Sequence, residues 1–395
     1  MNYTLKQPNF DNTANAFSLH SDTQLKKAYW IFYLMNKPWL VSACIFLTKL
    51  AFKLHLPVKK LILHTVFQHF CGGESIAQCQ ETIQKLAQNG IDTLLDYSVE
   101  GEENETSFNE TLGHILSTIE TAAESENMPF AVLKVTGLAS TALLENFQKH
   151  QTLSRVEEEQ LARVRERIRL LCQTAAKNGV QIFFDAEESW IQGAIDQLCY
   201  EMMALFNREK TFVYNTYQFY RRDMYDNYKK AVKKASESGY FLGAKLVRGA
   251  YMEKERLRAK THQYPDPIHI SKEIVDLNYN AAIRFSLTEI NRVSICLGTH
   301  NEESCRFCAT EMQALGIDRK DKRIYFSQLL GMSDNISFNM ALTGYNVVKY
   351  VPFGSIKAVM PYLFRRASEN KAIAGQSSRE FLLICRELQR RKGHK

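Results

Sequence analysis

The chain has 395 residues, of which 45% are hydrophobic and 24% charged. This composition is typical of a folded globular protein and excludes a largely disordered one. The formal net charge of +7 at pH 7 favours an anionic partner, such as an acidic ligand, a bilayer surface or nucleic acid. The length fits one large domain with an appendage, or two ordinary domains.

The nine cysteines are scattered along the sequence, which predicts reduced thiols in a cytosol-like compartment. Cys305 and Cys308 form a CxxC motif without a second pair or clustered histidines, so we expect no metal site. Residues 1–11 resemble neither a secretory signal nor an Arg/Ser-rich transit peptide. The longest uncharged apolar run, 38–48, is too short to span a bilayer.

Residues 1–85 predict an N-terminal helical arm. Apolar residues recur at helical spacing over 26–35, 39–56 and 58–70, and the glycines at 72 and 73 then end the pattern. A further amphipathic helix is predicted over 75–89, with Gly90 at the position that commonly follows a helix.

After Gly90 the pattern changes to short apolar runs separated by amphipathic helices. The eight runs are 91–97, 130–135, 180–184, 211–217, 241–247, 293–298, 324–328 and 347–351. Helices are predicted over 110–127, 155–178, 190–207, 222–238, 270–291, 302–315 and 335–342. This alternation predicts an α/β protein with a (β/α)8 TIM-like barrel. A doubly wound sheet is disfavoured because no strand is followed by GxGxxG or GxxxxGK[ST].

Polar residues follow most of the predicted strands, where a barrel places its chemistry. In chain order they include Glu100, Lys134, Asp185, Gln218, Lys245, Arg248, His300, Gln328 and Tyr350. Burying so many unpaired polar groups is costly, which favours an active site. Structural alternatives remain open: Lys134 could pair with Asp185 inside the barrel, residues 185–188 could cap a helix, His300 could be a buried hydrogen-bonded histidine, Gly249 could be a turn glycine, and residues 100–105 could be a solvated loop.

Two adjacent arginines, Arg365 and Arg366, follow the last predicted strand. A guanidinium offers a planar fork of donors that matches a carboxylate or a phosphate. Glu369 lies at helical spacing from both and could orient them. The alternative is a solvated helix with an ordinary ion pair.

Five motifs at these strand ends resemble the proline dehydrogenase family, flavoproteins with a distorted (β/α)8 barrel. They are KLVRGAY at 245–251, GTHN at 298–301, QLLGM at 328–332, KYVP at 349–352 and YLFRRASEN at 362–370. The resemblance covers about residues 86–380 and is closest to the monofunctional branch. It implies FAD as cofactor, L-proline as substrate and pyrroline-5-carboxylate as product.

The resemblance also assigns roles to residues. Arg365 and Arg366 would hold the proline carboxylate, Lys134 would add positive charge, and Glu369 would support the arginines. Tyr251, Leu329 and Tyr350 would pack on the ring, while Asp185 would lie near the amine and Lys245 would stabilise charge on the reduced flavin. The positions that match FAD contacts are Ala186, Gln218, Lys245, Val247, Arg248, Gly249, Ala250, Thr299, His300 and Asn301.

Three positions refine this expectation. Some relatives have Arg in place of Lys245, so the flavin potential is expected to differ from theirs. A hydroxyproline-oxidising branch has a smaller polar residue at the position of Tyr350, so Tyr350 favours proline, with hydroxyproline as the alternative. Glu100 matches a place where an acid pairs with an active-site arginine, and we expect a Glu100–Arg365 gate.

The resemblance also implies that electrons pass to a membrane quinone, the usual acceptor in the family. The basic amphipathic segment 381–392 and residues 39–60 are candidate contacts with an anionic bilayer, although helices packed on the barrel are an equal alternative for the second segment. We therefore expect an arm at 1–85, a barrel at 86–380 and a basic tail at 381–395. A non-catalytic membrane or nucleic-acid module would leave the strand-end residues unexplained, so no nucleic acid is expected. A pyrroline-5-carboxylate dehydrogenase on a separate chain is a further expected partner. The expected location is the bacterial cytoplasm at the inner membrane, or alternatively the matrix side of the mitochondrial inner membrane.

Overall fold

The computed structural model describes residues 7–97, 103–150, 152–372 and 376–393. Its eight parallel strands form a closed barrel in the order β1 to β8. They are β1 (Asp92–Tyr97), β2 (Phe130–Leu133), β3 (Gln181–Phe184), β4 (Val213–Gln218), β5 (Leu242–Val247), β6 (Val293–Gly298), β7 (Ile324–Leu329) and β8 (Val347–Phe353). Each strand lies within two residues of a predicted apolar run, so the predicted (β/α)8 barrel is confirmed.

The contacts divide the described chain into two compact units. The first contains residues up to Thr93 and from Gln328 onward, and the second contains Leu94–Tyr97 and the residues that lead up to Ser327. The domain boundaries predicted after residues 85 and 380 stay a prediction.

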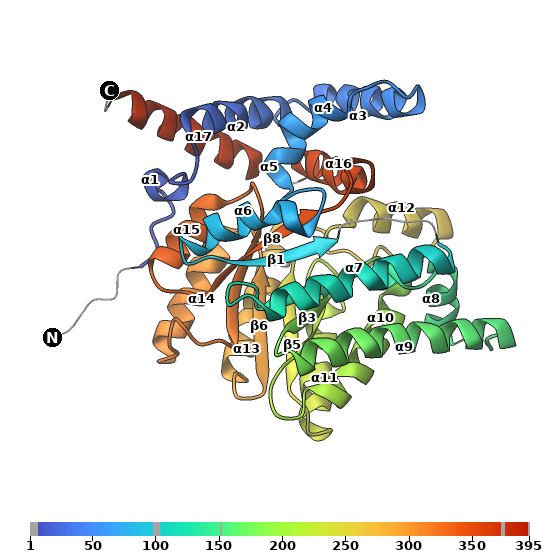
Figure 1. The fold of residues 1–395 in the computed structure, drawn as a ribbon. Coiled ribbons are helices and arrows are strands. Elements are labelled where there is room, and N and C mark those ends of the chain that lie inside the picture. Colours follow the sequence, from blue (N-terminus) through green and yellow to red (C-terminus); the bar gives the residue numbers. More distant parts are fainter. Residues whose placement is uncertain (1–6, 98–102, 151, 373–375, 394–395) are drawn as a thin grey trace. The chain divides into compact units, whose positions relative to one another are not determined.

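The second unit carries most of β1, all of β2 to β6 and most of β7, with helices outside the strands (Figure 1). Continuous apolar strands suit this arrangement because helices cover the sheet and the barrel interior is filled by side chains. Phe130, Phe183 and Tyr214 on neighbouring strands pack ring against ring. The helices are α7 (Glu105–Ala123), η2 (Val135–Gly137), α8 (Thr141–Gln148), α9 (Arg155–Lys177), α10 (Ser189–Phe206), α11 (Met224–Glu237), α12 (Met252–His262), α13 (Lys272–Thr288) and α14 (Glu302–Ala314).

Several helices of this unit begin at a cap that the sequence encodes. Ser154 and Glu157 form a capping box at the start of α9, in which each side chain satisfies a backbone N–H of the other residue. Asn301 caps α14 by accepting the N–H of Ser304 at 3.0 Å. Helices α8 and α12 were not predicted, since both are short segments inserted beside the alternating pattern.

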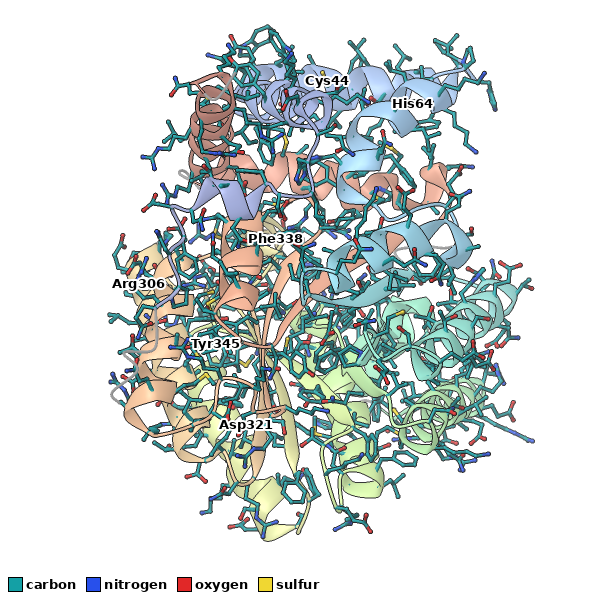
Figure 2. All side chains as sticks on the ribbon, turned by 60° about the vertical axis from the view of Figure 1, so that its left-hand side comes forward. Cys44, His64, Arg306, Asp321, Phe338 and Tyr345 are labelled. Carbon is teal, nitrogen blue, oxygen red and sulfur yellow. The ribbon has the colours of Figure 1, made fainter. Side chains whose placement is uncertain are left out.

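The first unit combines the N-terminal arm with the last strand and the C-terminal helices. Its helices are α1 (Thr13–Ala16), α2 (Asp22–Met35), α3 (Pro38–Lys53), α4 (Lys59–Ile62), η1 (Leu63–Phe67), α5 (Gln68–Phe70), α6 (Ile76–Ala87), α15 (Asp334–Leu342), α16 (Ile356–Ala372) and α17 (Gln376–Gly393). The single helix expected over 58–70 is interrupted by the π-helical turn η1. Figure 2 labels Cys44 on α3, His64 on η1 and Phe338 on α15.

A shared apolar cluster holds the first unit together. Phe32 from α2, Phe70 from α5, Val359 from α16 and Leu383 from α17 are all buried in it. Helix α17 packs along α2, as Figure 1 shows for the red and blue helices. Within the described ranges no single helix is long and apolar enough to cross a bilayer. The helices Asp22–Met35 and Trp39–Lys53, which are bent by 102° relative to each other, have the required length and apolar composition only when they are taken as a pair.

Candidate active site

Lys245 and Asp185 form an ion pair at the carboxyl ends of two barrel strands. The ammonium of Lys245, on β5, lies 2.5 Å from Oδ1 of Asp185, which follows β3. Both side chains are largely buried, and Lys245 also lies over the ring of Phe183 at 5.3 Å. In this low-dielectric setting a charge interacts more strongly with a ligand than it would in water. The ion pair therefore holds one positive and one negative group in fixed positions, where they can orient a polar ligand.

Lys134 follows β2 and pairs with Asp96 near the end of β1. The Nζ–Oδ2 distance is 3.2 Å, and Asp96 is almost completely buried. One alternative drawn from the sequence was an ion pair between Lys134 and Asp185. In the structure, Lys134 forms its ion pair with Asp96. Asp96 was missed because one acid inside an apolar run carries no spacing signal.

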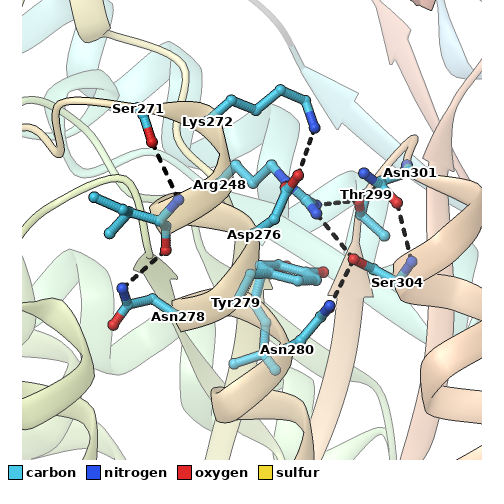
Figure 3. Close-up of polar contacts among 12 residues, drawn as sticks. Arg248, Ser271, Lys272, Asp276, Asn278, Tyr279, Asn280, Thr299, Asn301 and Ser304 are labelled. Atoms are coloured by element: carbon cyan, nitrogen blue, oxygen red, sulfur yellow. Dashed lines mark hydrogen bonds and ion pairs between the residues drawn. The ribbon is translucent and has the colours of Figure 1, made fainter.

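Arg248, directly after β5, is the centre of a polar cluster with α13 and the start of α14 (Figure 3). Its Nε donates to Asp276 at 2.7 Å, and its two terminal nitrogens donate to Thr299 and Ser304 at 2.7 and 2.9 Å. The guanidinium stacks over the ring of Tyr279 at 4.4 Å. This support fixes the orientation of Arg248.

Two cations act on Asp276 in this cluster. Burial opposes the charged form, yet Lys272 and Arg248 together hold the pKa of Asp276 below its ordinary value. The carboxylate therefore stays ionised near neutral pH. Asp276, Tyr279 and Ser304 were all missed from the sequence, because their helices showed only ordinary amphipathic spacing.

Glu187 is a buried acid between β3 and α10. Its carboxylate accepts the N–H of Thr136 at 3.1 Å and the hydroxyl of the same residue. Burial raises its pKa to about 7, and the bonds from Thr136 only partly offset this. The backbone oxygen of Glu187 accepts the amide of Gln218 at 2.7 Å, so Gln218 is held at the end of β4.

The glycine of the KLVRGAY motif is required by the backbone. Gly249 has φ = +130°, and a Cβ atom there would lie 2.5 Å from the ring of Tyr220. Only glycine adopts this conformation without strain. Ala250 is exposed and Tyr251 half-buried at the start of α12.

The other predicted cofactor residues of the second unit lie at the same ends of the strands. Thr299 is buried, while His300 and Asn301 are half-buried after β6, and Ala186 and Val247 are half-buried at β3 and β5. The structure thus brings together the residues predicted on β2 to β6.

The remaining predicted residues belong to the first unit. Leu329 ends β7, and Tyr350 is a buried residue of β8. Arg365 and Arg366 are half-buried on α16, where Arg366 lies 5.5 Å from the ring centre of Tyr362. Glu369 also lies on α16, but its side chain is outside the described parts, as is the whole of Glu100.

Comparison with known proteins adds a family assignment to this geometry. The family model for proline dehydrogenase matches residues 79–379. Mitochondrial proline dehydrogenase 1 of Homo sapiens is 41% identical over 265 residues, which are 65% of this chain and 44% of that protein. The carbapenem antibiotics biosynthesis protein CarD of Pectobacterium carotovorum is 33% identical over 324 residues, which are 82% of this chain and 83% of CarD.

Solved structures share the fold. Proline utilization A from Bdellovibrio bacteriovorus, inactivated by N-propargylglycine, matches with a TM-score of 0.70 and 21% identity, over 81% of this chain and 34% of that one. The chain thus spans less than half of the human relative and about a third of this structure. Because the family model covers most of the sequence, the chain belongs to the proline dehydrogenase family, whose members are FAD-dependent flavoenzymes.

Proposed function

We propose that this chain oxidises L-proline to pyrroline-5-carboxylate, the first step of proline catabolism, by hydride transfer to FAD. The observation that carries the proposal is the buried pair of Lys245 and Asp185 at the carboxyl ends of β5 and β3, within the segment that matches the family. Such strand ends are where barrel enzymes place their chemistry.

The donor set of the second unit fits FAD. Arg248 has five N–H donors, and its hydrogen bonds to Asp276, Thr299 and Ser304 use three of them. The remaining donors and the ammonium of Lys245 suit an anionic dinucleotide. The residues that would hold FAD are Ala186, Gln218, Lys245, Val247, Arg248, Gly249, Ala250, Thr299, His300 and Asn301. When bound, FAD would accept the hydride.

The side chains would contribute orientation and charge. Hydride leaves the ring carbon beside nitrogen most readily when the amine is neutral, because the nitrogen lone pair then forms the C=N bond. Asp185, held by Lys245, would orient the amine, while Lys245 would stabilise the negative charge that reduction creates. Arg365 and Arg366 would bind the carboxylate, with Lys134 adding positive charge and Glu369 supporting the arginines.

Specificity is proposed to come from the residues that pack on the ring. Tyr251, Leu329 and Tyr350 would form this contact, and the bulk of Tyr350 would disfavour a ring hydroxyl. Oxidation of hydroxyproline is the alternative activity. The ratio of kcat/KM for the two substrates distinguishes them, and a higher value for hydroxyproline would reverse the assignment.

Electrons are proposed to pass to a membrane quinone, and a separate pyrroline-5-carboxylate dehydrogenase would consume the product. Several relatives are named as mitochondrial, which supports the mitochondrial alternative for the location of this chain. Proline-dependent reduction of a water-soluble dye by FAD-loaded protein tests the activity without a membrane. The Lys245→Met variant should lose most of this activity, and full activity would contradict the proposed role of Lys245.

A further inference from the structure

Helix α3 turns an apolar stripe toward solvent. Trp39, Phe46 and Leu50 lie at helical spacing along its outer side, with exposed fractions of 72, 66 and 39%. Leu47 beside them is 59% exposed, while Val41 and Ala51 on the opposite side are buried. At a rise of 1.5 Å per residue, the stripe from Trp39 to Leu50 is roughly 17 Å long. An exposed apolar area of this kind marks an interaction surface.

The neighbouring helices of the same unit carry further exposed apolar side chains. Trp30 on α2 and Leu61 on α4 are 59 and 67% exposed, and α2, α3 and α4 form one row in Figure 1. We call the six residues Trp30, Trp39, Phe46, Leu47, Leu50 and Leu61 the docking face. Its two tryptophans are the side chains that prefer the boundary between lipid and water.

The charge of this segment identifies the partner. Between Asp22 and Glu74 the sequence has seven lysines and no acidic residue: Lys26, Lys27, Lys37, Lys49, Lys53, Lys59 and Lys60. All seven are exposed. A second copy of the chain would bring two such lysine-rich faces together, since a two-fold interface pairs each patch with itself. An anionic lipid surface instead meets both the apolar stripe and the lysines.

Among the described side chains of the C-terminal helix, Leu382 is the one large apolar residue that is exposed. Leu383 and Ile384 on α17 are buried in the apolar cluster shared with α2. Arg390 and Arg391 form ion pairs with Glu387 at 2.8 Å, and Arg391 also pairs with Asp22 at 2.9 Å. Most of the apolar side of this basic segment is therefore used within its own unit.

We propose that the docking face binds an anionic lipid bilayer, with aromatic and leucine side chains in the lipid boundary and the lysines at the headgroups. The inference deepens the proposed function, because a quinone acceptor dissolved in a bilayer requires the enzyme to reach that surface. The membrane contact is separable from proline oxidation, since no residue of the docking face belongs to the proposed active site.

Flotation of FAD-loaded protein with vesicles tests the proposal. The vesicles contain phosphatidylcholine with or without phosphatidylglycerol. The variant Trp39→Ser/Phe46→Ser/Leu50→Ser should bind the anionic vesicles at least tenfold more weakly than the wild type. The control Leu257→Ser/Ile270→Ser/Leu277→Ser, which removes three exposed apolar side chains of the second unit, should bind normally. Equal flotation of the two variants would overturn the proposal.

The charge contribution has its own test. Lys49→Gln/Lys53→Gln/Lys60→Gln should weaken binding to the anionic vesicles by roughly fivefold per lysine and leave the weak binding to neutral vesicles unchanged. An equal loss of binding to both kinds of vesicle would contradict the proposed contact between the lysines and the headgroups.

Dye-linked proline oxidation should persist in all these variants. A protein that floats with the vesicles but does not oxidise proline would therefore refute only the proposed function.

Tryptophan fluorescence locates the contact. The chain has three tryptophans, and a Trp190→Phe variant leaves only Trp30 and Trp39 as emitters. Brominated lipids should quench this variant, whereas unchanged emission would place the contact elsewhere. Sedimentation velocity tests whether a second copy of the chain binds the docking face instead. If the wild type is a dimer, and the triple serine variant is a monomer that still floats normally, the face is a dimer interface and the lipid proposal is rejected.

Discussion

Replacing Lys349 with methionine perturbs a fully buried charge in the first unit. Lys349 lies on β8 and has no exposed side-chain surface. Its ammonium pairs with Asp334 at 2.7 Å and donates to the backbone oxygens of Met332 and Leu329 at 2.6 and 3.2 Å. Methionine fills a similar volume but removes all three bonds, and it leaves the carboxylate of Asp334 buried.

The expected loss in the free energy of unfolding is about 3–5 kcal/mol, the range found when one partner of a buried ion pair is removed. His20, at 3.8 Å from Asp334, does not replace Lys349, because burial lowers its pKa and favours the neutral ring. The double variant Lys349→Met/Asp334→Asn should regain part of the loss, since the unpaired charge is then gone.

The contribution of Asp334 to stability should also depend on pH in opposite directions in the wild type and in the Lys349→Met variant. In the wild type, burial raises the pKa of Asp334, but the charge and the hydrogen bond of Lys349 outweigh this effect, and the net pKa is below its ordinary value. This carboxylate therefore stabilises the fold above the ordinary pKa, and the stabilisation is lost as pH falls through the lower folded-state value. Without Lys349 burial should dominate, so the variant should lose less stability at pH 5 than at pH 8.

Urea unfolding followed by circular dichroism at both pH values measures this change. Val348→Ala, which trims a buried apolar neighbour on the same strand, is the control for loss of packing without loss of charge, and its cost should not depend on pH. A Lys349→Met variant within about 1 kcal/mol of the wild type at pH 8 would show that Asp334 is neutral or solvated, and would refute the reasoning.

Four further predictions concern the site. Arg365→Met or Arg366→Met should raise KM for proline at least tenfold in steady-state kinetics, and should change the flavin content, measured by absorbance, much less. Loss of folding without a selective kinetic effect would indicate a structural role. Tyr350→Ser should raise the ratio of kcat/KM for hydroxyproline over proline, and an unchanged ratio would remove Tyr350 from specificity. Glu100→Ala should raise KM several-fold if the gate to Arg365 exists, and unchanged kinetics would dismiss it. Because the pKa of Glu187 is raised to about 7, the wild type should lose up to roughly 3 kcal/mol of stability as pH rises from the ordinary carboxyl value through 7; Glu187→Gln should flatten this slope in urea titrations from pH 4 to 8, and an unchanged slope would contradict the raised pKa.

The strands were predictable because each is a short apolar run in which burial on both faces dictates the residues. The run predicted over 241–247, for example, forms β5, Leu242–Val247. The candidate site was equally predictable, since Lys245, Arg248 and Thr299 directly follow or end such runs, and parallel strands place these ends together.

The partners of these residues could not be predicted. Asp96 with Lys134, and Asp276 with Arg248, come from elements far apart in the sequence and depend on the three-dimensional packing. Lys349 belonged to a recognised motif, but its buried pair with Asp334 has no local signal. The helical arm was predicted, although which of its faces stays exposed depends on how α3 packs with α2 and α16.

An anaerobic titration of the FAD-loaded protein with L-proline tests the central claim most directly. The flavin absorbance should bleach on addition of proline and recover on exposure to an electron acceptor, while a Lys245→Met variant that retains flavin should bleach much more slowly. A flavin-containing protein whose spectrum does not change with saturating proline would contradict the account.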